Sequence, residues 1–208
     1  SGIEIKLNCA IGSTVSFYDI KKKHNAILIA TGVYKPREIN LNYNKFPNVI
    51  PALDFLTASN RKGLNDKVKE FDSGKLDCNN KKVVVIGGGD TAMDCVRTAI
   101  RQGAQSVKCL YRRDQKNMPG SQTEVFNAIE EGIEFNWLTL PIKYFGKKNV
   151  ENVNIIKMQL GSQDETGRRQ SEQVPGSEYE IKSDLIIEAL GFDPENIQKM
   201  FNEPGLQV

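Results

Sequence analysis

The sequence predicts an α/β fold in which a parallel sheet is followed by an antiparallel hairpin. The first sign is the continuous apolar run VVVI at 83–86, which is typical of a strand covered on both faces. Strand and helix patterns then alternate as far as residue 138, as they do when crossover helices join parallel strands. From residue 152 the pattern becomes that of a hairpin, so the last strands are expected to pair antiparallel.

Two apolar runs stand apart from this central series, AILIATG at 26–32 and LIIEALG at 185–191. Each reads as a strand that ends in Ala-x-Gly, where glycine permits a sharp turn or a close approach to a ligand. Together they bracket the middle of the chain, as two strands on either side of an inserted domain do. Within the bracket, 51–63 has the apolar spacing of a helix that ends at Gly63, and the polar segment 65–80 is expected to be a loop or a short helix.

The central series has the clearest boundaries, because each of its helices ends on a glycine, a common C-terminal signal. Its expected elements are a strand at 83–86, a helix at 91–103, a strand at 106–111, a helix at 122–132 and a strand at 133–138. We expect these strands to form a parallel sheet with right-handed crossovers. Beyond it, strands at 152–161 and 178–191 are expected to pair antiparallel across a polar loop at 162–177.

The turn between the first central strand and its helix carries the spacing Gly87-x-Gly89-x-x-Ala92. Between a strand and a helix, this spacing indicates a Rossmann-like dinucleotide-binding domain. Gly87 permits a tight turn, Gly89 lets a pyrophosphate approach the backbone, and Ala92 keeps the helix close to the strand. The helix N-terminus offers unpaired N–H groups to the phosphates, and either Asp90 or Thr91 is suited to cap it. The alternative is a glycine-rich turn that binds no ligand.

Two arginines, Arg112 and Arg113, follow the second central strand, where such a fold often places an acid for the adenosine ribose. Their guanidinium groups suit a 2′-phosphate, and two such contacts favour NADPH over NADH by about a hundredfold or more. Two alternatives stay open: a solvated basic turn, and an ion pair of Asp114 with one of the arginines. Glu124, early in the next helix, is interpreted as compensating the helix dipole rather than as a ligand contact.

Composition and residue types argue against several other functions. The 208 residues include 28 basic and 26 acidic side chains, a balance that does not favour a nucleic-acid binder. No apolar stretch approaches the ~18 residues of a membrane span. None of the four cysteines forms a CxxC pair, so no metal site is expected, and Cys95 and Cys109 read as buried thiols of a cytoplasmic protein. The one histidine, His24, lies in a charged run that is typical of a solvated turn.

Five segments together resemble the small (beta) chain of bacterial NADPH-dependent glutamate synthase. They are ATGVYKPRE, VVVIGGGDTAMDCVRTAIRQGA, YRRDQKNMPGS, DETGRRQ with VPGSEYEI, and EALGFDPE. The resemblance covers nearly the whole chain. GGGDTAMD alone is shared with wider relatives, among them dihydropyrimidine dehydrogenase and other FAD–iron–sulfur reductases, so the combination carries the specificity.

The resemblance implies a Rossmann-like NADPH-binding domain inserted between strands of an incomplete FAD-binding domain, in a flavoprotein with two dinucleotide-binding domains. On this basis the FAD-binding domain contributes a remnant at 1–45, which includes the first crossover. The NADPH-binding domain is expected at 46–187, with its core at 81–140. The second crossover, at 188–208, leads back toward the FAD-binding domain. The family's FAD fingerprint and cysteine-rich iron–sulfur domain are not found in these residues. We therefore expect a piece of a longer polypeptide that is inactive by itself and that self-associates through an open sheet edge.

The implied function is hydride transfer from NADPH to FAD, with electrons passing over iron–sulfur clusters to the large (alpha) subunit of glutamate synthase. No catalytic side chain, metal ligand, nucleic acid or membrane is expected, because hydride transfer depends on the positioning of two rings. Two alternatives are the same module in another FAD–iron–sulfur oxidoreductase and a nucleotide-binding regulatory module without turnover. The residues expected at the cofactors are Gly87, Gly88, Gly89, Asp90, Thr91, Ala92, Arg112, Arg113, Ala30, Thr31, Gly32, Ala189, Leu190 and Gly191.

Overall fold

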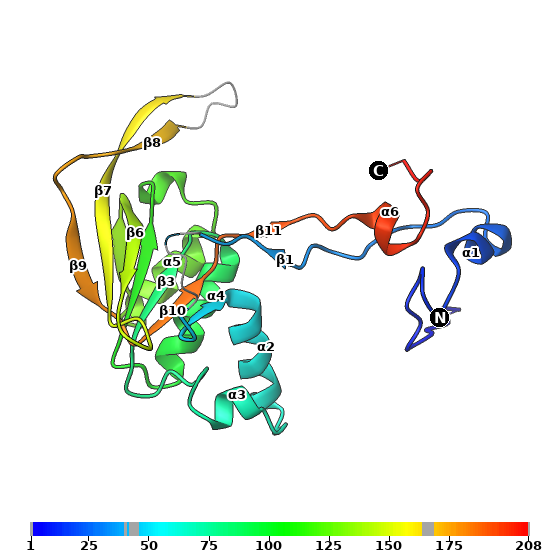
Figure 1. The fold of residues 1–208 in the computed structure, drawn as a ribbon, viewed down its shortest axis with the longest axis horizontal. Coiled ribbons are helices and arrows are strands. Elements are labelled where there is room, and N and C mark those ends of the chain that lie inside the picture. The colour runs from blue at the N-terminus through cyan, green and yellow to red at the C-terminus, as the bar shows by residue number, and fades with distance from the viewer. Residues whose placement is uncertain (1, 40, 42–45, 164–168, 208) are drawn as a thin grey trace. The chain divides into compact units, whose positions relative to one another are not determined.

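The computed structural model describes residues 2–39, 41, 46–163 and 169–207 (Figure 1). The middle of the expected polar loop, 164–168, lies outside the described residues. The chain divides into two compact units: a central unit, Pro36–Gly191, and a terminal unit made of Ser1–Lys35 and Phe192–Val208. The domain boundaries at 46 and 187 stay a prediction.

The central unit is built on a five-stranded sheet in which every neighbouring pair is parallel. Three of the strands confirm the expected central series. In spatial order the strands are β2 (Val49–Pro51), β10 (Leu185–Glu188), β3 (Lys82–Ile86), β4 (Ser106–Tyr111) and β5 (Glu134–Trp137). The expected helices also form, within one or two residues at their ends, as α2 (Ala52–Gly63), the short α3 (Lys69–Asp72), α4 (Asp90–Arg101) and α5 (Gln122–Glu130).

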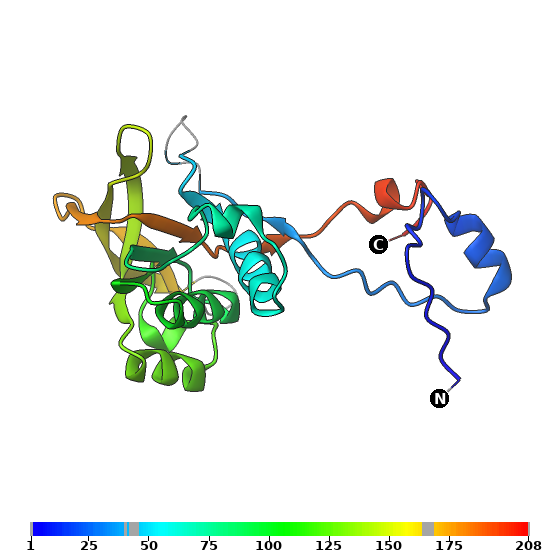
Figure 2. The same ribbon diagram turned by 90° about the horizontal axis from the view of Figure 1, so that it is seen from below.

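The parallel sheet is covered on both faces, which explains its continuous apolar strands. Side chains alternate along β3, so Val83 and Val85 pack with the helices while Val84 and Ile86 face the other way. That second face is covered by an antiparallel layer of β6 (Thr139–Phe145), β7 (Asn152–Gln163), β8 (Arg169–Gln173) and β9 (Tyr179–Lys182). Figure 2 shows the yellow and orange strands β7 and β9 well away from the cyan helix α2.

The antiparallel pairing is confirmed, but two details of it were wrong in the expectation from sequence. The segment 178–191 is not one antiparallel strand, because only β9 pairs with β7, and β10 turns away into the parallel sheet between β2 and β3. Leu185 and Ile187 are fully buried there, and only the interior of the sheet can cover both faces of such a run. The expected polar loop also contains a strand, β8, which pairs with β7.

The expected strand at 26–32 does not form, and the apolar residues near the start of the chain, Ile3, Ile5 and Leu7, form no strand either. Leu28 is 89% exposed and Ile3 is 79% exposed. A strand needs a neighbour for its backbone N–H and C=O groups, and the described residues supply none to these two runs. Instead, the two connections between the units pair with each other as β1 (Lys35–Pro36) and β11 (Phe192–Asp193).

The terminal unit brings the two ends of the chain together around one aromatic contact. Phe17 is the first residue of α1 (Phe17–Lys23), and Phe201 directly follows α6 (Ile197–Met200). The two rings stack with a distance of 5.0 Å between their centroids. His24 is the exposed C-cap residue of α1, in agreement with a solvated turn. Among the described residues, no helix has both the length and the apolar composition that a membrane crossing requires.

Asn48 joins three segments at the amino ends of the strands, and it is only 8% exposed. Its side-chain amide donates to the carbonyl oxygens of Val150 at 2.9 Å and Asp184 at 3.0 Å. Its side-chain oxygen accepts from the backbone N–H of Val150 at 2.8 Å. One side chain thus ties the residue before β2 to those before β7 and β10, and so holds the antiparallel layer against the parallel sheet.

Replacing this side chain should therefore destabilise the central unit. We expect Asn48→Ala to lower the free energy of unfolding by about 2–4 kcal/mol, because it leaves the buried backbone groups of Val150 and the part-buried carbonyl oxygen of Asp184 without these hydrogen bonds. Urea denaturation measures the change. The matched control is the exposed neighbour, Asn149→Ala, for which we expect a change below about 0.5 kcal/mol. Equal effects of the two substitutions would contradict the role of Asn48.

Ion pairs join α4 to α5. Arg97 contacts Glu131 with its Nε 3.0 Å from Oε1, and Arg101 reaches the same oxygen at 2.7 Å. The hydrogen bond from Arg97 holds the pKa of Glu131 below its ordinary value, against an opposing effect of desolvation. A carboxyl with a lowered pKa in the folded state stabilises the fold above its ordinary pKa, and this contribution is lost as the pH falls.

Glu131→Gln should lower the melting temperature at pH 7 by about 1–3 °C, because Arg101 loses its charged partner and Arg97 keeps only Glu124. The difference from the unchanged protein should shrink as the pH drops below the ordinary carboxyl pKa of about 4.5. Thermal denaturation followed by circular dichroism at pH 7 and at pH 4 tests this. Glu130→Gln, at an exposed position, is the control and should show no such pH-dependent gap.

Candidate nucleotide-binding site

A pocket of about 560 Å³ opens at the carboxyl ends of β10, β3 and β4. In open parallel sheets, ligands bind beyond the carboxyl ends of the strands, where the strand order reverses. Here the chain runs from β3 outward to β4 and β5 and returns to β10 on the other side of β3, so this is such a reversal point. The glycine turn after β3 and both arginines after β4 line the pocket.

A larger hollow of about 890 Å³ lies at the opposite, amino ends of the strands. Its lining includes Asn48, Lys81, Lys147 and Asp184. None of its described lining residues belongs to a glycine turn that joins a strand to a helix, so the smaller pocket is the better candidate for a nucleotide.

The glycine turn is shaped by close contacts on two of its three residues. Gly87 has a φ of +147°, and a β-carbon there would lie 2.2 Å from the carbonyl oxygen of Ala189. A β-carbon on Gly88 would lie 2.4 Å from the ring of Tyr111. A β-carbon on Gly89 would meet no protein atom within 4 Å, so the backbone at Gly89 faces open space. The fold requires glycine at positions 87 and 88, because a side chain there would clash with other protein atoms. At Gly89 the protein leaves space in which a ligand could approach the backbone.

Helix α4 begins directly after this turn with Gly89 as its N-cap, and no side chain caps it. The expectation that Asp90 or Thr91 caps the helix is therefore wrong. Asp90 is already the first helical residue, and its carboxylate accepts from the backbone N–H of Ser121 at 2.8 Å. Thr91 lines the pocket, and Ala92 is fully buried, which keeps the helix close to the sheet. The first N–H groups of a helix have no acceptor within it, so an anion at the turn would satisfy them.

Arg112 and Arg113 line the pocket at the end of β4. The Nε of Arg113 donates to the carbonyl oxygen of Arg169 at 3.1 Å, which links it to the first residue of β8. The carboxylate of Asp114 accepts from the backbone N–H of Asn117 at 3.0 Å and from its side chain at 2.6 Å. Asp114 thus caps the short 3₁₀ helix Gln115–Asn117. These contacts favour the pairing of Asp114 with Asn117 over an ion pair with one of the arginines.

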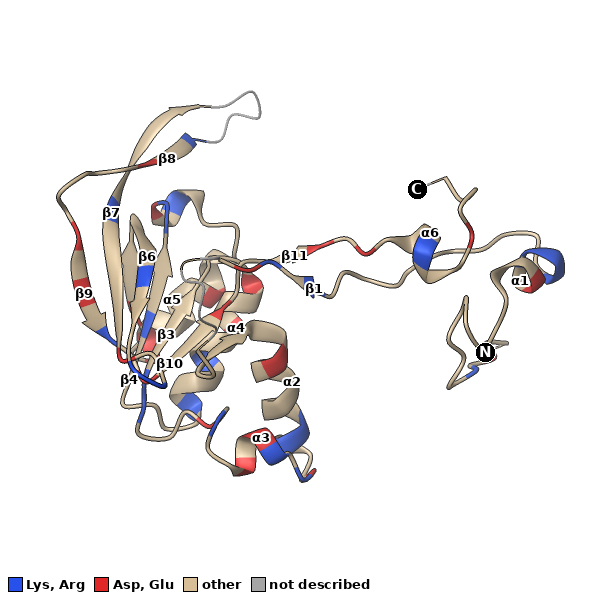
Figure 3. Cartoon of the chain, viewed as in Figure 1, with Lys and Arg blue, Asp and Glu red and all other residues tan. Residues whose placement is uncertain are grey.

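Glu124 points to α4 rather than to the pocket, because its Oε2 forms an ion pair with Arg97. This is a structural contact, in line with the interpretation that Glu124 is not a ligand contact. Basic and acidic residues are interspersed over the helices and strands of the central unit, as Figure 3 shows.

The crossover segment after β10 forms another wall of the pocket. The N–H of Ala189 donates to the carbonyl oxygen of Ile86 at 2.8 Å, and the N–H of Arg37 donates to that of Gly191 at 3.0 Å. Ala189, Leu190 and Gly191 therefore line the pocket beside the segment Arg37–Ile39. Ala30, Thr31 and Gly32 belong to the terminal unit, and their role stays a prediction.

Several pocket residues were not among those expected at the cofactors. They enter the pocket from segments far from the glycine turn in the sequence: Arg37, Glu38, Ile39, Pro119, Thr139, Leu140 and Pro141. They meet only because β10 returns to the middle of the sheet and β6 crosses its second face. No local sequence pattern predicts that these distant segments come together in the pocket.

Three of the four cysteines are buried, including Cys95 and Cys109, as their apolar surroundings in the sequence predict. Burial raises the pKa of the Cys78 and Cys109 thiols to about 12, so these thiols stay protonated and unreactive at neutral pH. Within the described ranges, no three His, Cys, Asp or Glu side chains are grouped so that they could hold a metal ion.

Comparison with known proteins agrees with this fold. A family model described as pyridine nucleotide-disulphide oxidoreductase matches residues 11–208. The chain is 50% identical over 208 residues to the glutamate synthase [NADPH] small chain of Azospirillum brasilense, covering all of this chain and 43% of that protein. It is 43% identical over 199 residues to the protein of the same name from Escherichia coli (strain K12), covering 95% of this chain and 42% of that one.

Among solved structures, Mycobacterium tuberculosis FprA in complex with NADPH has a TM-score of 0.73 and 19% identity, covering 89% of this chain and 54% of that one. At that identity the likeness shows the fold alone. The chain spans less than half the length of the two glutamate synthase small chains. Because the family model extends over nearly all its residues, the chain belongs to the pyridine nucleotide-disulphide oxidoreductase family.

Proposed function

We propose that this chain is the NADPH-binding part of a glutamate synthase small chain. The observation that carries the proposal is the pocket itself, which combines an open glycine turn, the uncapped start of α4 and two arginines at the end of β4. The 50% identity with a glutamate synthase [NADPH] small chain over all 208 residues supports the same reading. In the whole protein, NADPH supplies a hydride that reduces FAD, and this chain's part is to bind and orient the donor.

The turn from Gly87 to Ala92 would hold the pyrophosphate. The space in front of Gly89 has room for phosphate oxygens, and Gly88 belongs to the same backbone loop. The N–H groups at the start of α4 would donate to those oxygens, and the helix dipole favours negative charge there. Thr91, which lines the pocket, lies within the first turn of this helix. The whole arrangement fits a dinucleotide diphosphate.

Arg112 and Arg113 would hold the 2′-phosphate of NADPH. Both lie beside the pocket, and a planar guanidinium can give two hydrogen bonds to one phosphate. The bond from Arg113 to the carbonyl oxygen of Arg169 uses Nε and fixes the orientation of the guanidinium. Its terminal nitrogens remain geometrically suited to a phosphate, because the two ends of the fork point in different directions.

The FAD would be bound by a larger part of the whole protein than this chain. In the described residues of the terminal unit, no strand leads through a glycine turn into a helix, and Ser16 caps α1 by accepting from the N–H of Asp19. We assign Ala30, Thr31 and Gly32, with Ala189, Leu190 and Gly191, to the two crossovers between the nucleotide domains, near the nicotinamide and the flavin. Iron–sulfur clusters would carry electrons onward to the large (alpha) subunit, in the cytoplasm.

The choice of cofactor can be tested directly. In the full-length protein, NADPH should bind at least tenfold more tightly than NADH, since the 2′-phosphate gains charge-assisted bonds from the arginines. Arg112→Ala combined with Arg113→Ala should remove this difference by weakening NADPH and leaving NADH unchanged. Calorimetric titration at one ionic strength measures both affinities.

The control for charge alone is Lys147→Ala combined with Lys148→Ala, which removes two positive charges from the exposed turn between β6 and β7. It should leave the ratio of the two affinities unchanged. Equal binding of NADPH and NADH by the unmodified protein would contradict the assignment of the arginines.

The glycine turn offers a test that separates binding from folding. Gly89→Ala places a methyl group in the open space of the pocket, so NADPH binding should weaken by about tenfold or more while the free energy of unfolding changes by less than about 1 kcal/mol. Gly87→Ala places its methyl group against the carbonyl oxygen of Ala189 and should destabilise the fold by about 2 kcal/mol or more. Chemical denaturation and calorimetry compare the two variants. If Gly89→Ala bound NADPH normally, the pyrophosphate would lie elsewhere.

A further inference from the structure

Glu188 is the only charged residue of β10, whose other three side chains are apolar. Leu185 and Ile187 pack with the helices, and Ile186 faces the antiparallel layer. By the alternation of the strand, Glu188 faces the same layer as Ile186, opposite Ile86 of β3. Placing a carboxylate there costs free energy unless other groups compensate it by hydrogen bonding. Its presence therefore needs an explanation beyond packing.

The carboxylate of Glu188 accepts hydrogen bonds from two other segments. The hydroxyl of Tyr144, on β6, donates to its Oε1 at 2.9 Å, and the backbone N–H of Ile39 donates to it as well. Tyr144 is only 5% exposed. Burial raises the pKa of Glu188, and these two hydrogen bonds oppose the rise. The residue thus connects β10, β6 and the segment Arg37–Ile39, three elements that are distant in the sequence.

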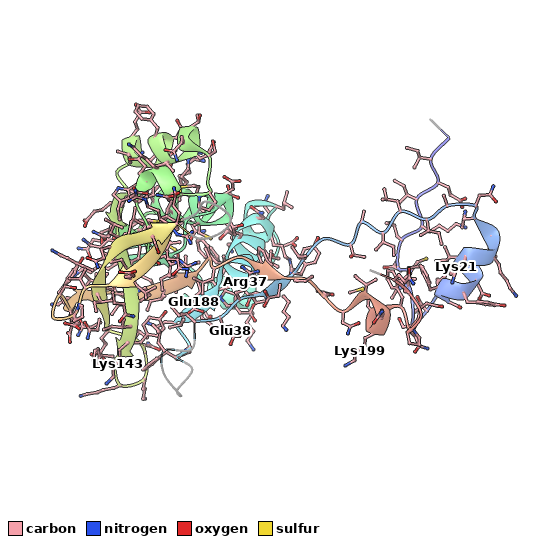
Figure 4. All side chains as sticks on the ribbon, turned by 90° about the horizontal axis from the view of Figure 1, so that it is seen from above. Lys21, Arg37, Glu38, Lys143, Glu188 and Lys199 are labelled. Carbon is pink, nitrogen blue, oxygen red and sulfur yellow. The ribbon has the colours of Figure 1, made fainter. Side chains whose placement is uncertain are left out.

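These three elements are also walls of the nucleotide pocket. Figure 4 shows Glu188, Arg37 and Glu38 close to one another where the chain enters and leaves the central unit, and the electrostatic effect of Glu38 on Glu188 agrees with their proximity. Arg37–Ile39 lines the pocket, and so do Ala189 and the glycine turn. Because Ala189 follows Glu188 directly, anything that fixes Glu188 also fixes the contact between Ala189 and Gly87.

The proposed function sets which half of the cofactor lies here. With the pyrophosphate at the glycine turn and the 2′-phosphate beside the arginines, the adenosine lies toward β4. The strand order puts β10 on the opposite side of β3 from β4. The other half of the dinucleotide, which carries the nicotinamide, must then extend toward β10 and the segment Arg37–Ile39.

We propose that Glu188 and Tyr144 form a positioning pair that holds the segment Arg37–Ile39 against the end of β10 and so shapes the nicotinamide half of the pocket. This inference rests on the proposed function, because it takes the bound molecule to be NADPH. The pair acts through the backbone of its neighbours, and neither residue transfers a proton or a hydride.

The test compares two ligands on the full-length protein: NADPH, and adenosine 2′,5′-bisphosphate, which has the adenosine half and lacks the nicotinamide. Glu188→Ala should weaken NADPH binding by about tenfold, since it removes the acceptor of both hydrogen bonds. Tyr144→Phe removes one of the two and should weaken it by about threefold. Both variants should bind the bisphosphate within about twofold of the unchanged protein, because its site lies on the other side of β3.

Glu188→Gln is the conservative rescue, since its amide oxygen can accept from the N–H of Ile39 while its NH2 group donates to the hydroxyl oxygen of Tyr144. It should restore most of the NADPH affinity lost in Glu188→Ala. The fluorescence of the reduced nicotinamide gives a second readout, because its enhancement on binding reports how closely the pocket surrounds the ring. This enhancement should fall in Tyr144→Phe even at saturating NADPH. Glu180→Gln, on the exposed side of β9, is the matched control and should change neither ligand.

Each result bears on the proposal. Selective weakening of NADPH with reduced fluorescence supports it. Equal weakening of both ligands, or no change in either, overturns it. If Glu188→Ala does not fold, Tyr144→Phe and Glu188→Gln still decide the question. If the unmodified protein bound neither ligand, the proposed function itself would be overturned. The double variant Arg112→Ala with Arg113→Ala serves as a control on the probe. It should lose bisphosphate binding, which confirms that the bisphosphate reports on the adenosine half of the site.

Discussion

The close approach between Gly87 and the carbonyl oxygen of Ala189 is the constraint on which the rest of the site depends. A β-carbon at Gly87 would lie 2.2 Å from that oxygen, so the turn after β3 and the end of β10 can meet only if the residue is glycine. This contact directs the chain into α4 and points the start of the helix at the pocket. It also brings the crossover after β10 to the pocket wall. The anion-binding turn and the crossover are thus one structural unit.

The two covered faces of the parallel sheet make this contact rigid. Helices pack on one face of β3 and the antiparallel layer packs on the other, so the strand cannot shift without opening both cores. The sheet is completed only when β10 inserts between β2 and β3, late in the chain. The pocket therefore forms through contacts between residues about a hundred positions apart, and it depends on the tertiary structure of the whole central unit.

Three acids near the pocket accept hydrogen bonds from protein groups that help to form it. Asp90 accepts from Ser121, Asp114 caps a 3₁₀ helix through Asn117, and Glu188 accepts from Tyr144. Each of these carboxylates thus stabilises a loop or a crossover that forms the pocket. The same logic applies outside the pocket, where Glu124 and Glu131 tie α5 to the arginines of α4. The arginines at the end of β4 provide the positive charge that a 2′-phosphate requires.

The central strands and helices, the glycine turn and the arginine pair could be predicted from the sequence, because each depends on residues close together in the chain. An apolar run, a helical period and a Gly-x-Gly spacing are local signals, and local backbone preferences act on them directly. Other features follow from contacts between segments that are distant in the sequence. The run at 185–188 joins a parallel sheet, and the run at 26–32 has no partner strand among the described residues. The carboxylate of Asp90 accepts from the backbone N–H of Ser121 and does not cap the helix. These outcomes depend on which distant segment supplies a hydrogen-bond partner or a covering apolar face, and the packing of the whole unit decides that.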